Sequence, residues 1–212
     1  MIDFIGMPKI ARLSREIVVS EKIDGTNALV YISDDLSPIT LQSGRVVPFL
    51  VGSKSRWIFP ENDNHGFARW AYEHAEVLLK LGKGWHRGEW MGQGIQRNYG
   101  LKEKRFYLFN TSRWVKYEGF DILSLTERNY VPVLKEKQEY CPDCCYVVPV
   151  LYQGIFDMGT IDYCLATLKN EGSIAIGGFK PAEGIVIYHV AANMYFKKTI
   201  LHDESPKGLV KE

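Results

Sequence analysis

The sequence has no long apolar run, and this absence excludes whole classes of protein. No stretch approaches the roughly 18 consecutive apolar residues that a membrane-spanning helix requires. Residues 1–19, MIDFIGMPKIARLSREIVV, carry charges throughout and lack the apolar core of a secretory signal. We therefore expect a soluble, cytoplasmic protein that contacts no membrane.

The chain also lacks an excess of charge of either sign. Lys and Arg total 26 and Asp and Glu total 25, so the net charge is +1. Without a global attraction for polyanions, the chain can bind nucleic acid only through a local cluster of basic residues. Residues 94–106, GIQRNYGLKEKRF, form one such cluster, which fits either a solvated face or a contact with nucleic-acid phosphate.

Cysteine is scarce as well. Three of the four cysteines lie in CPDCC, residues 141–145, and the fourth is Cys164. A Cys-x-x-Cys pair can supply half of a tetrahedral zinc site, but no second pair and no His-x-x-x-His motif follows. We expect reduced loop thiols, with a zinc site as the alternative, and no disulfide framework.

Length and composition predict one domain built mostly of short strands. The 212 residues, 46% hydrophobic and 24% charged, are enough to bury a core, and no repeat or linker marks a boundary within residues 1–212. Two strands are expected at 26–33 and 39–47, joined by the turn DDLSP. Short strands are also expected within residues 86–92, 105–114, 117–123, 147–154, 183–190 and 193–200.

Two helices are expected among these strands. Residues 67–81 place Phe67, Trp70, Ala71, His74, Val77, Leu78 and Leu81 on one face at spacings of three and four. Asp63 or Asn64 should begin this helix and Gly82 should end it, with His74 as a core or boundary residue. A second helix is expected at about 160–170.

One lysine has an unusual setting. In VVSEKIDGTNALVYI, residues 18–32, Lys22 comes two residues before an Asp-Gly pair, inside a segment that otherwise predicts β-structure. Lys-x-Asp-Gly alone is a weak signal, because four letters recur by chance. The chain continues with RGEW containing Glu89, FYLFN containing Phe109, EGIVIY containing Glu183, and YFKKT containing Lys197 and Lys198.

The order, spacing and strand-like setting of these motifs resemble the covalent nucleotidyltransferase superfamily of ATP-dependent polynucleotide ligases and capping enzymes. The resemblance runs from about residue 9 to residue 199. EKIDGTN places Asn27 where DNA ligases usually have an arginine. It is similar to the phage RNA ligase branch that seals nicks in duplexes and includes the trypanosome editing ligases. GEWMGQGIQR and VPVLYQG are similar to small phage-encoded members of that branch.

The resemblance implies an α+β nucleotidyltransferase fold, with antiparallel β-sheets enclosing a nucleotide cleft and helices flanking it. It implies ATP and Mg²⁺, or Mn²⁺, as cofactors. The expected partner is nucleic acid with 3′-OH and 5′-phosphate ends, in a nicked duplex, and the expected state is a monomer. Because the chain ends soon after Lys198, we expect no carboxy-terminal accessory domain.

The same resemblance implies the catalytic roles. Lys22 would attack the α-phosphate of ATP and carry AMP. Lys197, Lys198 and the metal ion would neutralise the α-phosphate and favour the neutral amine of the nucleophile. Glu89 and Glu183 would hold ribose hydroxyls and metal-bound water.

Five further residues receive roles by resemblance. Asp24 and Asn27 would position the hydration shell of the metal. Arg45 would contact AMP and the 5′-phosphate end, Phe109 would stack on adenine, and Glu21 would lie near the adenine amino group. The residue types alone also fit plainer roles, such as a core aromatic for Phe109 and a surface charge for Arg45.

The chain departs from the family in its last motif, where two lysines are usually spaced by one residue but here are adjacent. If Lys197 and Lys198 lie on one strand, their side chains point to opposite faces, so only one enters the cleft. We expect Lys197 to contact the α-phosphate and Lys198 to reach pyrophosphate or nucleic acid.

Three other functions remain compatible with the motifs. A capping-type guanylyltransferase would use GTP, but EKIDGTN follows the ligase pattern. A minimal DNA ligase remains open, because no motif distinguishes ribose from deoxyribose strands. A non-catalytic binding relic is disfavoured because every expected catalytic position is filled.

Overall fold

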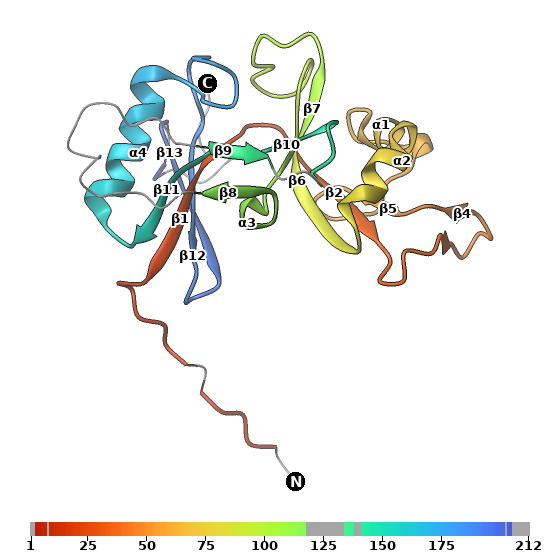
Figure 1. Cartoon of the computed structure of the whole chain (residues 1–212), viewed down its shortest axis with the longest axis horizontal. Helices are drawn as coiled ribbons and strands as arrows, with labels where there is room; N and C mark the ends of the chain where they lie inside the picture. Colours follow the sequence, from red (N-terminus) through yellow and green to blue (C-terminus); the bar gives the residue numbers. More distant parts are fainter. Residues whose placement is uncertain (1–2, 8, 118–133, 138–140, 202, 205–212) are drawn as a thin grey trace.

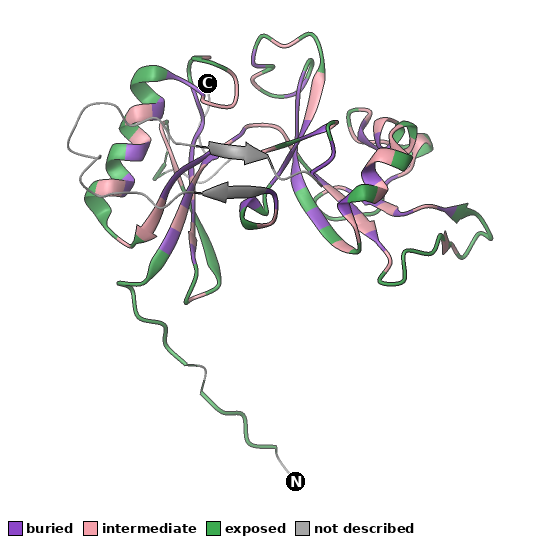
Figure 2. Cartoon of the chain, in the orientation of Figure 1, coloured by how far each residue is buried: buried purple, intermediate pink, exposed green. Residues whose placement is uncertain are grey.

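The computed structural model describes residues 3–7, 9–117, 134–137, 141–201 and 203–204. The strands form two main sheets, and each sheet has helices on the side away from the other sheet (Figure 1). Buried residues follow the strands and the inner faces of the helices, whereas the extended segment before the first strand is exposed (Figure 2). The strand expected at 117–123 lies outside the described residues, apart from Tyr117.

The first sheet has four antiparallel strands, in the order β11 (Val150–Ile155), β1 (Glu16–Lys22), β12 (Gly184–His189) and β13 (Met194–Thr199). Alternate residues of β1, such as Ile17 and Val19, are buried against helix α4 (Met158–Glu171), as the two-residue period of a strand requires. Asp157 caps α4 by accepting a hydrogen bond from the Thr160 N–H. The strands and helix expected in these segments are confirmed.

The second sheet has five strands, in the order β10 (Cys145–Val147), β7 (Lys104–Leu108), β6 (Gly84–Gly92), β2 (Thr26–Ile32) and β5 (Leu50–Gly52). Neighbouring strands are antiparallel, except that β10 and β7 are parallel. One face is covered by α1 (Phe67–Glu73), α2 (Ala75–Leu78) and the 3-10 helix η2 (Leu79–Leu81). Phe67, Leu78 and Leu81 from these helices share a core cluster with Val30 and Phe106 of the sheet.

The chain crosses from the first sheet to the second between β1 and β2. Only Ile23, Asp24 and Gly25 lie between the end of β1 at Lys22 and the start of β2. Ile23 packs in a third cluster with Met91 of β6 and other residues beside this crossing. The crossing is the Lys-x-Asp-Gly motif itself, so the motif places Lys22 where the two sheets meet.

The structure corrects the strand expected at 39–47. This segment forms two short strands, β3 (Ile39–Thr40) and β4 (Val46–Val47), which pair with each other and not with β2. The turn between them includes Gly44 at φ +80°, a left-handed conformation that glycine adopts without strain. The expected strand at 105–114 is also shorter, because β7 ends at Leu108 and Thr111–Trp114 forms helix α3.

The helix expected at 67–81 is interrupted. The break is at His74, where φ is −104° and ψ is 22°, and its Nδ1 donates to the Trp70 carbonyl at 2.8 Å. The Trp70 carbonyl therefore accepts hydrogen bonds from both the backbone N–H and the ring of His74, and a new helix begins at Ala75. The expected end at Gly82 is confirmed, and the Asp63 carboxylate accepts from two N–H groups of the first turn.

The remaining described elements are small. The 3-10 helix η1 (Pro60–Asn62) follows β5, and β8 (Val115–Tyr117) pairs with β9 (Leu134–Lys137) as a separate two-stranded sheet.

Candidate active site

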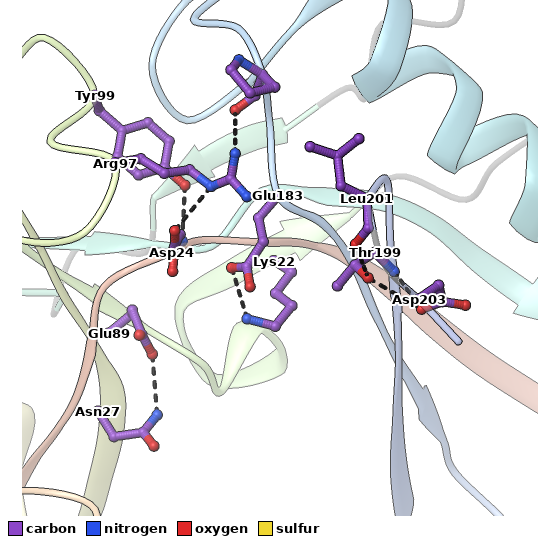
Figure 3. A network of polar contacts seen from close by, with 11 residues as sticks. Lys22, Asp24, Asn27, Glu89, Arg97, Tyr99, Glu183, Thr199, Leu201 and Asp203 are labelled. Atoms are coloured by element: carbon purple, nitrogen blue, oxygen red, sulfur yellow. Dashed lines mark hydrogen bonds and ion pairs between the residues drawn. The ribbon is translucent and has the colours of Figure 1, made fainter. Parts of the chain in front are cut away.

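The Lys22 side chain is paired with a buried carboxylate. Its Nζ atom lies 2.7 Å from Oε2 of Glu183, the residue that precedes β12 (Figure 3). The two side chains are 20% and 7% exposed, so the pair is largely removed from water. Two motifs that are 161 residues apart in the sequence therefore meet in one ion pair.

Glu89 brings a second buried carboxylate from the other sheet. It lies on β6, and its Oε2 accepts a hydrogen bond from Nδ2 of Asn27 at 3.1 Å. Burial raises the pKa of Glu89 to about 7, the charge of Lys22 opposes this rise, and the charge of Glu183 adds to it. Lys22, Glu89 and Glu183 therefore act on one another as a cluster of two carboxylates and one amine.

Two motif glycines permit this close arrangement. A Cβ atom at Gly25 would collide with the Trp90 carbonyl, and a Cβ atom at Gly88 would collide with the Tyr107 carbonyl. The glycines of the Asp-Gly and Arg-Gly-Glu steps are thus required because neighbouring backbone lies against them.

Asp24 has other partners. Its Oδ2 lies 2.9 Å from Nε of Arg97, and its N–H donates to the Tyr99 hydroxyl at 2.8 Å (Figure 3). Arg97 also donates to the Pro181 carbonyl at 3.2 Å. Arg97 is therefore neither a solvated charge nor a free phosphate contact, because it ties the Lys22 turn to the segment before Glu183. The sequence had placed Arg97 only in a basic cluster.

The adjacent lysines lie on β13, so the prediction that they share a strand is confirmed. The Lys198 ammonium lies 2.6 Å from Oδ1 of Asp162 on α4, which fixes its direction toward the helix. Lys197 is paired with Val186, and Val186 with Ser20, which lies two residues before Lys22. By strand alternation Lys197 faces the same side of the first sheet as Lys22.

Two candidate residues are not brought into this cluster. Glu21 is 1% exposed on the α4 side of β1, where its carboxylate accepts hydrogen bonds from Ser173 Oγ and from the N–H groups of Ile174 and Ala175. Burial raises the pKa of Glu21, and these hydrogen bonds oppose the rise. Arg45 is exposed next to β4 and forms an ion pair with Glu61 at 2.8 Å.

Phe109 lies at one end of a pocket of about 460 Å³ on the face of the second sheet away from α1 and α2. Asn27 and Gly88 line the same end, Leu29 is paired with Arg87 nearer the middle, and Asn27 connects the pocket to Glu89. The other end is lined by residues that the sequence analysis did not select: Ser53, Lys54, Ser55, Arg56, Trp57, Trp85 and Arg87. A usable signal was present, because GSKSRW places two cations and a tryptophan directly after an apolar segment.

Within the part of the chain that the structure describes, the cysteines belong to no group of three or more side chains arranged to hold zinc. Cys141 and Cys145 pack in the core of the second sheet, whereas Cys164 packs between α4 and the first sheet. Cys164 is therefore not available to complete a site with CPDCC. Burial raises the pKa of Cys164 to about 12.

The two glutamates suit a hard divalent cation. Among the described residues, no group of three or more His, Cys, Asp or Glu side chains is arranged as a metal cage. Mg²⁺ rarely needs such a cage, because it is bound through one or two carboxylates, water and substrate phosphates. Burial is the main cause of the raised pKa of Glu89, and the charge of Glu183 adds to it, so a cation supplied together with a phosphate ligand would stabilise the two carboxylates in their charged form.

Comparison with known proteins also supports chemistry on a phosphate ligand with a divalent cation. A family model described as RNA ligase matches residues 15–201. A search of curated proteins found none that matches.

No helix in the described ranges has the length and apolar character to cross a membrane.

Among solved structures, the chain resembles an RNA ligase of Naegleria gruberi. An apo variant of that ligase aligns with a TM-score of 0.52 at 19% identity, covering 88% of this chain and 50% of that one. A variant with ATP and Mn gives a TM-score of 0.51 at 19% identity, with the same coverage of 88% and 50%. A variant with AMP and Mn gives 0.51 at 18% identity, again covering 88% and 50%. The chain thus spans half the length of these ligases and shares their nucleotidyltransferase fold.

Proposed function

Because the chain belongs to the RNA ligase family, we propose that it is an ATP-dependent RNA ligase that joins 3′-OH and 5′-phosphate ends. The observation that carries the proposal is the cluster of Lys22, Glu183 and Glu89 at the crossing between the sheets. Nothing else among the described residues combines a partly exposed amine, two buried carboxylates and an adjoining pocket.

In the first step, Lys22 becomes adenylylated. Its Nζ atom leaves the ion pair with Glu183, transfers a proton to water and forms a bond to the α-phosphorus of ATP. The bond from that phosphorus to the bridging oxygen breaks, and pyrophosphate leaves. Lys197 lies on the same face of the first sheet as Lys22 and supplies positive charge to the α-phosphate.

The adenosine occupies the Phe109 end of the pocket. Phe109 is 39% exposed, so its ring can stack on adenine. Asn27 lines the same pocket as this ring and donates to Glu89, and these two side chains hold the ribose and orient the α-phosphate. A Mg²⁺ or Mn²⁺ ion held by Glu89 and Glu183 would stabilise negative charge on the phosphates.

In the later steps, AMP moves from Lys22 to the 5′-phosphate end, and the 3′-OH attacks that phosphate and releases AMP. The similarity of EKIDGTN to the nick-sealing branch supports nicks in duplexes as the junction and a monomer as the acting state. Ligation assays on nicks with ribonucleotides or deoxyribonucleotides on each side would define the strands. Sealing of single-stranded ends in preference to nicks would contradict the duplex assignment.

A single assay tests the adenylylation step. The protein is incubated with α-labelled ATP or GTP and Mg²⁺, and label retained after denaturing electrophoresis is measured. We expect label from ATP, none from GTP, and none in Lys22→Ala. Label from GTP alone would indicate a capping-type enzyme, and label from neither nucleotide would indicate a binding protein.

A further inference from the structure

The second end of the pocket contains an aromatic pair that the proposed reaction does not use. Trp57 and Trp85 have ring centroids 5.7 Å apart and an interplanar angle of 26°, and Tyr31 packs against Trp85 at 4.7 Å. The two tryptophans remain 38% and 53% exposed. Large aromatic side chains left this open are commonly binding surfaces, because water is a poor neighbour for their faces.

Three cations line the same pocket as this aromatic pair. Lys54 and Arg56 lie on the segment after β5, where Arg56 also donates to the Asn62 carbonyl at 3.0 Å, and the Arg87 guanidinium lies 5.4 Å from the Trp85 ring centroid. Among the described residues, no carboxylate lines the pocket and none of the three cations forms an ion pair. The aromatic surface therefore lies in uncompensated positive charge, which complements a ligand that has both a flat ring and a phosphate.

The aromatic pair is separate from the adenosine position. Trp85 precedes Glu89 by four residues on β6, a separation of about 13 Å along an extended strand. Phe109 is hydrogen-bonded through its N–H to the Arg87 carbonyl, so it lies level with Arg87 and nearer to Glu89 than Trp85 does. An ATP whose α-phosphate reaches Lys22 and whose adenine stacks on Phe109 leaves the Trp57–Trp85 surface open.

We propose that Trp57 and Trp85, with Lys54, Arg56 and Arg87, form a stacking site for an unpaired nucleobase in a single-stranded stretch of RNA that flanks the nicked duplex. This inference rests on the proposed RNA ligase function and adds a recognition site to it. Stacking tolerates any base, whereas the cations contact the flanking phosphates, so the site binds single-stranded RNA without reading its sequence.

The test measures binding of a fluorescein-labelled single-stranded RNA of roughly 12 nucleotides, a length within known site sizes, by anisotropy without ATP. Trp57→Ala and Trp85→Ala should each raise the Kd about 5- to 150-fold, and Trp85→Phe should restore most of the affinity. Lys54→Gln with Arg56→Gln should reduce the salt dependence of binding by about 0.7 in slope for each phosphate that is no longer neutralised. Tyr163→Ala, an exposed aromatic change on α4, should bind RNA like the unaltered protein.

Other outcomes overturn the stacking site. A blunt RNA duplex has no unpaired base, so the tryptophan variants should lose less affinity for the duplex than for single-stranded RNA. An equal loss of affinity for both would exclude the site. Equal RNA affinity in the tryptophan variants and the unaltered protein, or no RNA binding at all, would exclude the site. A rise in the ATP concentration needed for adenylylation of Trp85→Ala, with RNA affinity unchanged, would assign the pair to ATP. If the unaltered protein is not adenylylated, the proposed function fails, but the RNA affinities of the variants still decide the stacking site.

Discussion

Around Lys22, charged side chains of ordinary types lie in an unusual environment, because apolar strands shield them from water. Glu183 and Glu89 come from different sheets, yet both act on the same amine. Desolvation raises the pKa of Glu89 to about 7, whereas an exposed glutamate would titrate near 4.5. Lys22, the nucleophile of the proposed reaction, rests in an ion pair with Glu183, and a cation that binds the carboxylates would release it for reaction with ATP.

The adjacent lysines should differ in their effect on adenylylation. Lys197 faces the side of the sheet that carries Lys22, whereas Lys198 is paired with Asp162. Removing a charged donor from a reacting phosphate costs about 2–4 kcal/mol of transition-state stabilisation. Lys197→Ala should therefore slow single-turnover adenylylation about 30- to 1000-fold, and Lys198→Ala should have a smaller effect.

Asp162→Ala provides the matched control for this comparison. It removes the partner of Lys198 on α4 without altering either lysine, so adenylylation should stay near the rate of the unaltered protein. A larger defect in Lys198→Ala than in Lys197→Ala would show that the faces of β13 are assigned the wrong way round.

Arg97 should be coupled to Asp24 energetically. The Arg97–Asp24 ion pair is about three-quarters buried on each side, and Arg97 also holds the Pro181 carbonyl. Removing one partner of a buried ion pair is strongly destabilising, because it leaves the other charge buried and uncompensated. Urea unfolding of Arg97→Ala, Asp24→Ala and the double variant should give a coupling energy of about 1 kcal/mol or more. Additive losses would mean that the two side chains act independently.

At the scale of secondary structure, the sequence predicts the strands that carry motifs. Strands β1, β2, β6 and β12 have buried alternation or motif glycines that leave few alternatives, and α4 has a capped start. The hairpin of β3 and β4 was missed because apolar residues on both sides of Gly44 suggested a single strand. The interruption at His74 was missed because periodicity records which face is apolar and not how the backbone hydrogen bonds run.

The free energy of unfolding should depend on pH because of His86, which lies on strand β6. This residue is 4% exposed on the core face, and its Nε2–H donates to the Gly82 carbonyl at 2.7 Å. Burial, with a further contribution from Arg113, lowers the pKa of His86 to about 4. An unfolded histidine binds a proton near pH 6.5. Between these values the unfolded state binds more protons, so the free energy of unfolding falls as pH falls.

His86→Gln isolates this effect, because glutamine can donate to the same carbonyl but does not titrate. Urea unfolding gives the free energy of unfolding at pH 7 and at pH 4.5. Between these two pH values, the free energy of unfolding should fall by about 2–3 kcal/mol more in the unaltered protein than in the variant. Other groups titrate in both proteins and cancel in the difference. Equal losses would mean that His86 is protonated in the folded protein.

At the scale of the whole molecule, the site depends on how two sheets meet. The sequence motifs identified Lys22, Glu89 and Glu183, and the structure brings them together. Arg45 illustrates what motifs do not predict, because its place on the β3–β4 hairpin depends on a turn and on pairing with Glu61. Lys54 and Arg56 reach the pocket instead, because the loop after β5 folds against the face shared by β2 and β6.

Nucleotide and metal together should stabilise the packing of the two sheets. Lys22 and Glu183 belong to the first sheet and Glu89 to the second, so a ligand bound by all three links them. A ligand at about 100 times its Kd adds about 2.7 kcal/mol to the free energy of unfolding, or about 5–10 °C in Tm at this size. Mg²⁺ with a non-hydrolysable ATP analogue should therefore raise the Tm, and Glu89→Gln with Glu183→Gln should remove most of that rise.

Chelation should separate the contribution of the metal from that of the nucleotide. Two buried carboxylates and the phosphates of ATP bring together more negative charge than Lys22 and Lys197 offset, so the complex needs a hard divalent cation. Excess EDTA should abolish adenylylation and reduce the rise in Tm produced by the analogue, and Mg²⁺ or Mn²⁺ should restore both. Full adenylylation in excess chelator would mean that lysines alone neutralise the phosphates, and Glu89 and Glu183 would then act only on the ribose and on the resting lysine.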